Sequence, residues 1–283
     1  MRLLRYGPRG AEKPGLLDAE GRIRDLSREI PDINAAALAP ESLARLASRD
    51  PVSLPLVSGE PRIGAPVANV PNLVCIGLNY VDHARETNSP IPEIPIVFMK
   101  HTGSIMGPND PVRIPRDART TDWEVELGIV IGSAASCVSE DDALDVVAGY
   151  CIGNDVSERE HQMNGGGGQW IKGKSHPTFA PLGPWLVTKD EVTDPQNLSM
   201  WLDVSGTRRQ TGSTSTMIFG VKTIVSHVSK HMSLFAGDII LTGTPPGVGA
   251  GHKPKPVFLR AGDVMTVGIE GLGEQRQEVV PFD

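Results

Sequence analysis

The sequence predicts a strand-dominated α+β fold. From Asn72 onward, short apolar runs alternate with turns, and the chain holds 31 Gly and 24 Pro among its 283 residues. Short apolar runs bounded by turn residues are typical of buried strands in a mostly antiparallel arrangement. Helical periodicity is confined to a few segments, so the regular alternation of a doubly wound fold is not expected.

The first 66 residues differ from the rest and predict a small N-terminal domain with helix and strand. Three short strands are expected there, at residues 3–6, 14–17 and 23–25. An Ala- and Leu-rich helical stretch follows over residues 34–48, and then a connector containing Pro51, Pro55, Pro61 and Pro66. Residues 67–283 form the expected second and larger domain.

Within the larger domain, eight apolar runs are expected to be strands: residues 73–77, 96–99, 125–131, 146–152, 185–188, 200–204, 238–242 and 264–269. Four segments have helical periodicity: residues 80–87, 143–147, 157–163 and 219–233. Two Gly-rich stretches are interpreted as turns. Residues 165–168 lack the ending of a phosphate-binding loop, and residues 247–251 run into His-Lys-Pro-Lys-Pro, which cannot begin a helix.

Composition excludes several classes of protein. The net charge of -7 and the pI near 5.5 argue against nucleic-acid binding, which depends on clustered Lys and Arg.

The three cysteines, Cys75, Cys137 and Cys151, are expected to be buried free thiols in a reducing compartment. The N-terminus lacks the apolar core of a signal peptide, and no apolar run reaches the length of a membrane span, so we expect a cytoplasmic protein without membrane attachment.

Two carboxylates lie inside an apolar run that otherwise predicts a buried strand. Glu124 and Glu126 are two positions apart, so both should leave one face of the strand. Trp123, Val125 and Leu127 should then pack on the opposite face. Because unpaired buried anions are costly, a positive charge must lie beside the two acids.

A second acidic segment favours a metal ion as that positive charge. Asp155 follows another apolar run, and neither acidic motif contains Cys or His. Three carboxylates form a hard-oxygen ligand set suited to Mg²⁺, Mn²⁺ or Ca²⁺ rather than Zn²⁺, and we favour Mg²⁺ or Mn²⁺. The alternative is that Glu124 and Glu126 lie on a solvated face and pair with surface Lys or Arg.

Three further motifs offer catalytic groups. His83 and Glu86 are three positions apart, at the start of an expected helix, and so share a face. A carboxylate beside an imidazole raises its basicity, as is needed to take a proton from water, although such pairs also occur on surfaces. Lys174 is suited either to stabilising an oxyanion or to balancing the charge of a metal site. The turn at Thr244 offers hydroxyls and backbone donors for a substrate carboxylate.

In this order, the motifs resemble those of the fumarylacetoacetate hydrolase family over about residues 70–280. The matching stretches are GLNYVDHARE, GPNDPVRIP, DWEVELGIVIG, VAGYCIGNDVSER, QWIKGKS, GDIILTGTPPGVG and IEGLGEQRQEV. The whole chain is most similar to the bacterial subgroup of 2,4-diketo-3-deoxy-L-rhamnonate hydrolases, many of which carry a ureidoglycolate lyase label.

The resemblance implies a catalytic domain with a mixed β-sandwich roll, a homodimer, and a set of site residues. It places Mg²⁺ or Mn²⁺ on Glu124, Glu126 and Asp155. It assigns water activation to His83 and Glu86, and oxyanion stabilisation to Lys174. The implied substrate contacts are Tyr80, Lys100, Arg159, Gln162 and Thr244.

The activity expected from these residues is metal-dependent hydrolysis of a carbon–carbon bond in a 2,4-dioxo acid. The example is 2,4-diketo-3-deoxy-L-rhamnonate, which would give pyruvate and lactate. One alternative is oxaloacetate decarboxylation, or lyase or tautomerase chemistry, at the same site. Another is a non-catalytic binding protein.

Two positions depart from the family pattern. Pro177 stands where the family usually has an acid, which is expected either to loosen Lys174 or to change specificity. Ser205 replaces the usual Asn. Residues 164–168 are expected to form a flexible loop beside the site.

Overall fold

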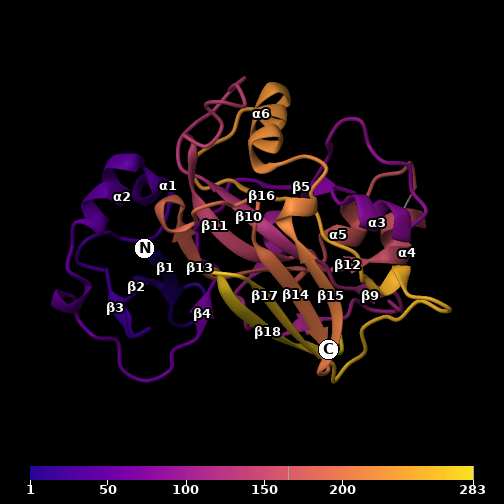
Figure 1. Ribbon diagram of the computed structural model, residues 1–283. Helices are drawn as coiled ribbons and strands as arrows, with labels where there is room; N and C mark the ends of the chain where they lie inside the picture. The colour runs from indigo at the N-terminus through magenta and orange to yellow at the C-terminus, as the bar shows by residue number, and fades with distance from the viewer. Residues whose placement is uncertain (165, 283) are drawn as a thin grey trace.

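Strands dominate the computed structural model, which describes residues 1–164 and 166–282 (Figure 1). In chain order the strands are β1 (Arg2–Tyr6), β2 (Lys13–Leu17), β3 (Ile23–Asp25), β4 (Ile63–Gly64), β5 (Leu73–Gly77), β6 (Ile96–Lys100), β7 (Ile105–Met106), β8 (Val112–Arg113), β9 (Thr121–Asp122), β10 (Val125–Ile131), β11 (Val147–Asn154), β12 (Ser157–Glu158), β13 (Ala180–Thr188), β14 (Ser199–Val204), β15 (Thr207–Ser213), β16 (Ile239–Leu241), β17 (Val264–Ile269) and β18 (Gly273–Val280). The α-helices are α1 (Ala35–Leu38), α2 (Pro40–Ala47), α3 (Val81–Glu86), α4 (Arg159–Asn164), α5 (Ile171–Lys174) and α6 (Val221–His231).

Two large sheets and one small sheet are formed by the described residues. The largest has the order β3-β2-β1-β13-β11-β10-β16-β5-β6, with β4 beside β1 and β7 beside β13. The second has the order β15-β14-β17-β18-β8, and the small sheet pairs β12 with β9. Most pairings are antiparallel, but β16 with β5, β13 with β7 and β18 with β8 are parallel. The prediction of a strand-dominated α+β fold is therefore confirmed, with mixed sheets.

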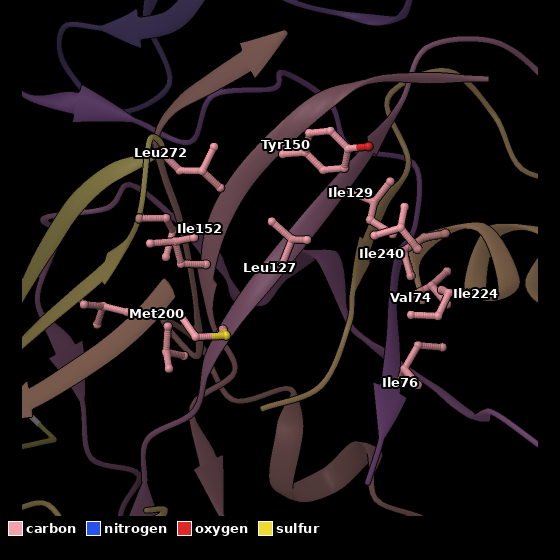
Figure 2. Packing of buried hydrophobic residues seen from close by; sticks show 14 of the residues in the cluster. Val74, Ile76, Leu127, Ile129, Tyr150, Ile152, Met200, Ile224, Ile240 and Leu272 are labelled. Carbon is pink, nitrogen blue, oxygen red and sulfur yellow. The ribbon is translucent and has the colours of Figure 1, made fainter. Parts of the chain in front are cut away.

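Both faces of the largest sheet are covered, and β10 shows how. Val125, Leu127 and Ile129 belong to a core that includes Met200 and other residues of the second sheet. Val130 points the other way and joins a second core with residues of the N-terminal segment. Figure 2 shows Leu127 between the two sheets. The alternation predicted along this strand is therefore observed.

The N-terminal segment extends the largest sheet rather than forming a sheet of its own. Strand β1 pairs with β13, with Leu3 opposite Leu186. Helices α1 and α2 lie beside these strands, at the left of Figure 1. The segment shares both a sheet and a core with later residues. The two-domain division at residue 66 stays a prediction.

Several element predictions were wrong, and the causes are physical. Residues 143–147 are not a helix, because residues 143–146 form a turn and Val147 begins β11. Strands β15 and β18 were missed because they bury glutamines where an apolar residue is usual. Gln210 lies on β15, and Gln275 and Gln277 on β18, each 0% exposed and hydrogen-bonded.

The cysteine prediction holds for two of the three positions. Cys75 and Cys151 are buried free thiols, whereas Cys137 is exposed. Cys137 lies in a bend with a φ of 53°. Among the described residues, no helix combines the length and the apolar character that crossing a bilayer requires.

Truncating a core side chain on β10 should cost a large part of the stability of the fold. Leu127 is 0% exposed and packs between the two sheets. Leu127→Ala should lower the free energy of unfolding by about 2–5 kcal/mol, because it leaves a cavity that the sheets cannot close. Urea unfolding followed by fluorescence measures the change. Leu56→Ala, at a leucine that is 52% exposed, is the control and should change it by less than about 0.5 kcal/mol.

Candidate active site

Three acidic side chains converge at the start of β10 and the adjacent end of β11. Glu126 lies in β10 opposite Gly153 of β11, Glu124 directly precedes β10, and Asp155 directly follows β11. The backbone N–H of Asp155 donates to the carbonyl of Glu124 at 2.9 Å, which fixes the two segments together. One carboxylate oxygen from each acid lies within 4.8 Å of the other two, and all three residues are buried.

This acidic triad fits a hard divalent cation. Magnesium–oxygen bonds of about 2.0–2.1 Å place opposite ligands about 4 Å apart, close to the span of these oxygens. Glu126 accepts the N–H of Gly243 at 2.8 Å, and it has no ion pair with any residue in the described ranges. Burial, and then the Asp155 and Glu124 carboxylates, raise the pKa of Glu126 well above its usual range. A bound cation would supply the positive charge that Glu126 lacks.

Two lysines neutralise the other two acids. Lys174 Nζ donates to Glu124 at 2.7 Å and to Asp155 at 2.8 Å. Lys100 Nζ donates to the second Asp155 oxygen at 2.5 Å from the buried end of β6. Burial opposes the charge on Lys174, but Asp155 and Glu124 outweigh it and raise the pKa of Lys174. The lysine therefore stays protonated within the triad.

Arg159 connects the triad to a fourth buried acid, Asp122, and through it to the 3-10 helix η5 (Gly249–Gly251). Its guanidinium lies 2.7 Å from Glu124 and donates to Asp122 at 2.8 Å. Asp122 in turn accepts the backbone N–H groups of Gly249 and Ala250. Burial alone would raise the pKa of Glu124, but the nearby basic groups hold it well below its usual range.

His83 and Glu86 lie on one face of α3, as their spacing predicts. The ring Nδ1 of His83 is 3.2 Å from Glu86 Oε2. The Glu86 carboxylate is itself fixed by the backbone N–H of Gly247, at 2.9 and 3.1 Å to its two oxygens. A tautomer that donates Nδ1–H to Glu86 leaves Nε2 free to accept a proton. The pair has the arrangement of a general base and its orienting acid.

A cavity of about 370 Å³ unites these groups. Seven ionisable residues from distant parts of the chain line it: His83, Glu86, Glu124, Glu126, Arg159, Lys174 and Lys253. Gln162 and Thr244 line it as well. Helices α3, α4 and α5, which carry several of the lining residues, lie at the right of Figure 1, on the side opposite the N-terminal segment. Its size suits a small organic acid.

The side chains of three predicted substrate contacts are bonded within the protein, and their contact with substrate stays a prediction. Tyr80 is fully buried with its hydroxyl on Met200 Sδ at 3.2 Å, and it does not line the cavity. Lys100 lies behind Asp155 and does not line it either. Thr244 lines the cavity, but its hydroxyl donates to the carbonyl of Val125 at 2.9 Å. These three side chains are engaged by the protein itself.

Sequence reasoning missed four residues of the cavity region: Asp122, Phe98, Trp170 and Lys253. Asp122 precedes Glu124 by two positions, so the same alternation that marks the glutamates could have identified it. Phe98 and Trp170 meet edge to face at 5.2 Å and form an apolar wall. Lys253 lines the cavity from the loop after η5 (Gly249–Gly251), and no sequence signal identifies it.

The structure also shows where the two residues that depart from the family pattern lie. Ser205 occupies the turn between β14 and β15 with a φ of 48°, a conformation that Asn tolerates better than Ser. Pro177 follows His176, whose ring contacts His161. Of the expected flexible loop, Gly165 lies outside the described residues, and Gly166 to Gly168 have positive φ.

Comparison with known proteins gives a consistent result. Residues 72–280 match the family model described as fumarylacetoacetate (FAA) hydrolase C-terminal. A relative from Burkholderia lata with a provisional hydrolase name is 59% identical over 277 residues, covering 98% of each chain. The fumarylacetoacetate hydrolase structure from Exiguobacterium antarcticum is 36% identical, with a TM-score of 0.88 over 100% of both chains. The maleylpyruvate hydrolase structure from Sphingobium sp. SYK-6, in complex with manganese(II) ion and pyruvate, is 28% identical, with a TM-score of 0.81 over 100% of both.

Proposed function

This chain belongs to the fumarylacetoacetate hydrolase family, and we propose that it is a divalent-metal-dependent hydrolase that cleaves a carbon–carbon bond of a 2,4-dioxo acid. The products are pyruvate and a second acid. The observation that carries the proposal is the cavity in which the acidic triad, with its unpaired Glu126, lies near the His83–Glu86 pair.

Glu124, Glu126 and Asp155 would hold Mg²⁺ or Mn²⁺. When bound, the ion supplies Lewis-acid stabilisation of the negative charge that develops on the ketoacid portion of the substrate. The buried triad would contribute three carboxylate oxygens to the ion. The Sphingobium structure supports this assignment, because it holds manganese and pyruvate and shares the fold.

His83 supplies the base. Its Nε2 takes a proton from water while Glu86 holds Nδ1–H, and the water oxygen attacks C4 of the dioxo acid. The C3–C4 bond then breaks, and its electron pair leaves with the C1–C3 fragment, which takes up a proton to become pyruvate. C4 becomes the carboxylate of the second acid, so one water is consumed and no oxidant is needed.

The lysine and arginine of the site act through charge. Lys174 stays protonated beside Glu124 and Asp155, and it lines the cavity. Its charge opposes the negative charge formed when water attacks C4. Arg159 also lines the cavity, and its guanidinium is held in place by Asp122. Both groups therefore favour anionic substrates.

The rhamnonate-derived dioxo acid, cleaved to pyruvate and lactate, is the specific substrate that we propose from the sequence resemblance. An assay of pyruvate release tests the class and the member together. The panel holds 2,4-dioxopentanoate, 2,4-diketo-3-deoxy-L-rhamnonate and a 2,4-dioxo diacid, since Lys253 lines the cavity and favours a second negative charge. Each is assayed with Mg²⁺, with Mn²⁺ and with EDTA.

We expect pyruvate from at least one 2,4-dioxo acid, and its loss by at least about 100-fold in EDTA, because the ion contributes several kcal/mol. Release that is unaffected by EDTA would contradict the metal-dependent mechanism. Metal binding without turnover of any oxo acid would favour a non-catalytic binding protein.

A further inference from the structure

Two short helices carry three of the polar side chains in the cavity. Helix α4 spans six residues and bears Arg159 and Gln162, and α5 spans four and ends at Lys174. Helices this short are not stable alone, so their positions depend on contacts with their surroundings. The placement of Lys174 relative to Arg159 is therefore set by whatever fixes α5 against α4.

One such contact is a close approach of the backbones. A Cβ atom at Gly173 would lie 2.4 Å from the backbone nitrogen of Gln162 and 2.5 Å from the carbonyl oxygen of Glu158. Only glycine allows α5 to lie this close to α4 and β12. The contact sets the separation of the helices but forms no polar link between them.

A histidine pair supplies that link. Nδ1 of His161, in α4, lies 2.9 Å from Nε2 of His176, two residues after Lys174. The ring of His176 also packs edge-on against Phe179, at 5.2 Å between ring centres. A hydrogen bond between two imidazoles needs one protonated and one bare nitrogen. The neutral pair and the singly protonated pair both satisfy this condition, but two imidazolium rings present two donors and repel each other.

The charged and titratable groups around the pair come from four elements. Glu158 of β12 and Lys100 of β6 act on His176 in opposite directions, and Lys172 of α5 lines the same surface groove as both rings. His101, after β6, donates its backbone N–H to Ser175 beside His176. Burial, and then His161, lower the pKa of His176. Because the groove is open to solvent, protons reach both rings.

We infer that His161 and His176 are positioning residues that hold Lys174 beside Arg159 and Gln162, and that acid releases this hold when both rings are protonated. The inference rests on the proposed function, in which Lys174 opposes the charge formed at C4. The direction of the pH dependence follows from the hydrogen bond between the two rings. The bond is present while at most one ring is protonated and is lost when the second proton binds. Burial and the neighbouring His161 lower the pKa of His176, so this loss falls below the ordinary histidine value of about 6.5.

The test compares kcat/KM for the best 2,4-dioxo acid from pH 8 to pH 5 in the wild type and in His176→Gln. A glutamine amide can donate or accept, so it keeps a hydrogen bond to His161 in either protonation state. Taking the ratio of wild type to variant cancels the pH effects that both proteins share. We expect a constant ratio above the ordinary histidine pKa and a fall of about two- to tenfold in acid, the worth of one hydrogen bond.

His231→Gln is the matched control, because His227 and His231 form another ring contact, at 4.7 Å, on α6 and outside the cavity lining. Its ratio should stay flat. A flat ratio for His176→Gln, or an equal fall for His231→Gln, would overturn the inference.

A second measurement separates this inference from the proposed function. Nuclear magnetic resonance of the ring nitrogens should show the protonation of His176, and the amide signals of Gly173 and Lys174 should shift with it. This result in a protein that cleaves no oxo acid would reject the function while supporting the histidine pair. Protonation of His176 that leaves the Gly173 and Lys174 amides unmoved would reject the role of the pair, whatever the activity.

Discussion

Glu126→Gln should lower metal-dependent turnover by roughly 10²–10⁴-fold, because Lewis-acid stabilisation is worth several kcal/mol. Glu126 is the triad acid without a basic partner, whereas Glu124 and Asp155 are already neutralised by Lys174, Lys100 and Arg159. The amide keeps an oxygen that can accept the N–H of Gly243, so the backbone contact survives while the charge is lost. Calorimetric titration with Mn²⁺ should show a matching loss of affinity.

A second buried acid provides the control for this substitution. Asp18 has a fully buried side chain that pairs with Arg24 at 2.8 Å in the N-terminal segment. Asp18→Asn should reduce stability but leave Mn²⁺ affinity per folded molecule unchanged. If Glu126→Gln binds Mn²⁺ as tightly as the wild type, the triad is not the metal site. Retention of full turnover with weakened binding would instead separate the metal from the reaction.

Part of this site could be predicted because it depends on local geometry. The period of two along a strand places Glu124 and Glu126 on one face, and the period of a helix places His83 beside Glu86. Asp155 follows a strand that lies next to β10, so one antiparallel pairing is enough to bring the three acids together. These relations involve few residues and strong steric rules.

The remaining features depend on contacts between distant segments. Lys100 comes from a strand 55 positions before Asp155, and nothing in its neighbours marks it as the partner of a buried acid. The sequence likewise does not show that Tyr80 turns its hydroxyl to Met200. For both, the family resemblance implies contact with substrate, and that role stays a prediction. Tertiary packing decides which side of a motif faces the cavity.

The same limit applies to the fold. Most of the longer apolar runs were identified, because burial of both faces selects apolar residues along the whole strand. Strand β18 escaped prediction, since Gln275 and Gln277 satisfy buried carbonyls of Ile152 and Pro108 that belong to other segments. A buried glutamine is stable only when such partners exist. Its sequence neighbours do not reveal them.

His83→Ala should reduce hydrolysis of a 2,4-dioxo acid by roughly 10²–10⁴-fold, the usual contribution of a positioned general base. The variant removes the imidazole that takes the proton from water, and it leaves the acidic triad intact. Pyruvate release at saturating Mg²⁺ measures the loss. Glu86→Gln should have a smaller effect of roughly 10–100-fold, because it disturbs the orientation of the ring without removing it.

The same variant distinguishes hydrolysis from decarboxylation. Loss of carbon dioxide from oxaloacetate also develops negative charge on a ketoacid fragment, but it needs no attacking water and therefore no base at His83. If the cavity supports both reactions, His83→Ala should keep oxaloacetate decarboxylation within about threefold while hydrolysis falls by orders of magnitude. His231→Ala, at an exposed ring of α6, should change neither rate.

The outcomes of this comparison lead to different assignments. Equal loss of both reactions in His83→Ala would mean that the imidazole supports substrate or metal binding, and the proposed attack by water would be wrong. Unchanged hydrolysis would remove His83 from the mechanism altogether and leave Lys174 or a water in the cavity to act as base. We assign the role of base to His83 and not to Lys174, because Glu124 and Asp155 hold Lys174 protonated. A protonated lysine is a poor base at neutral pH.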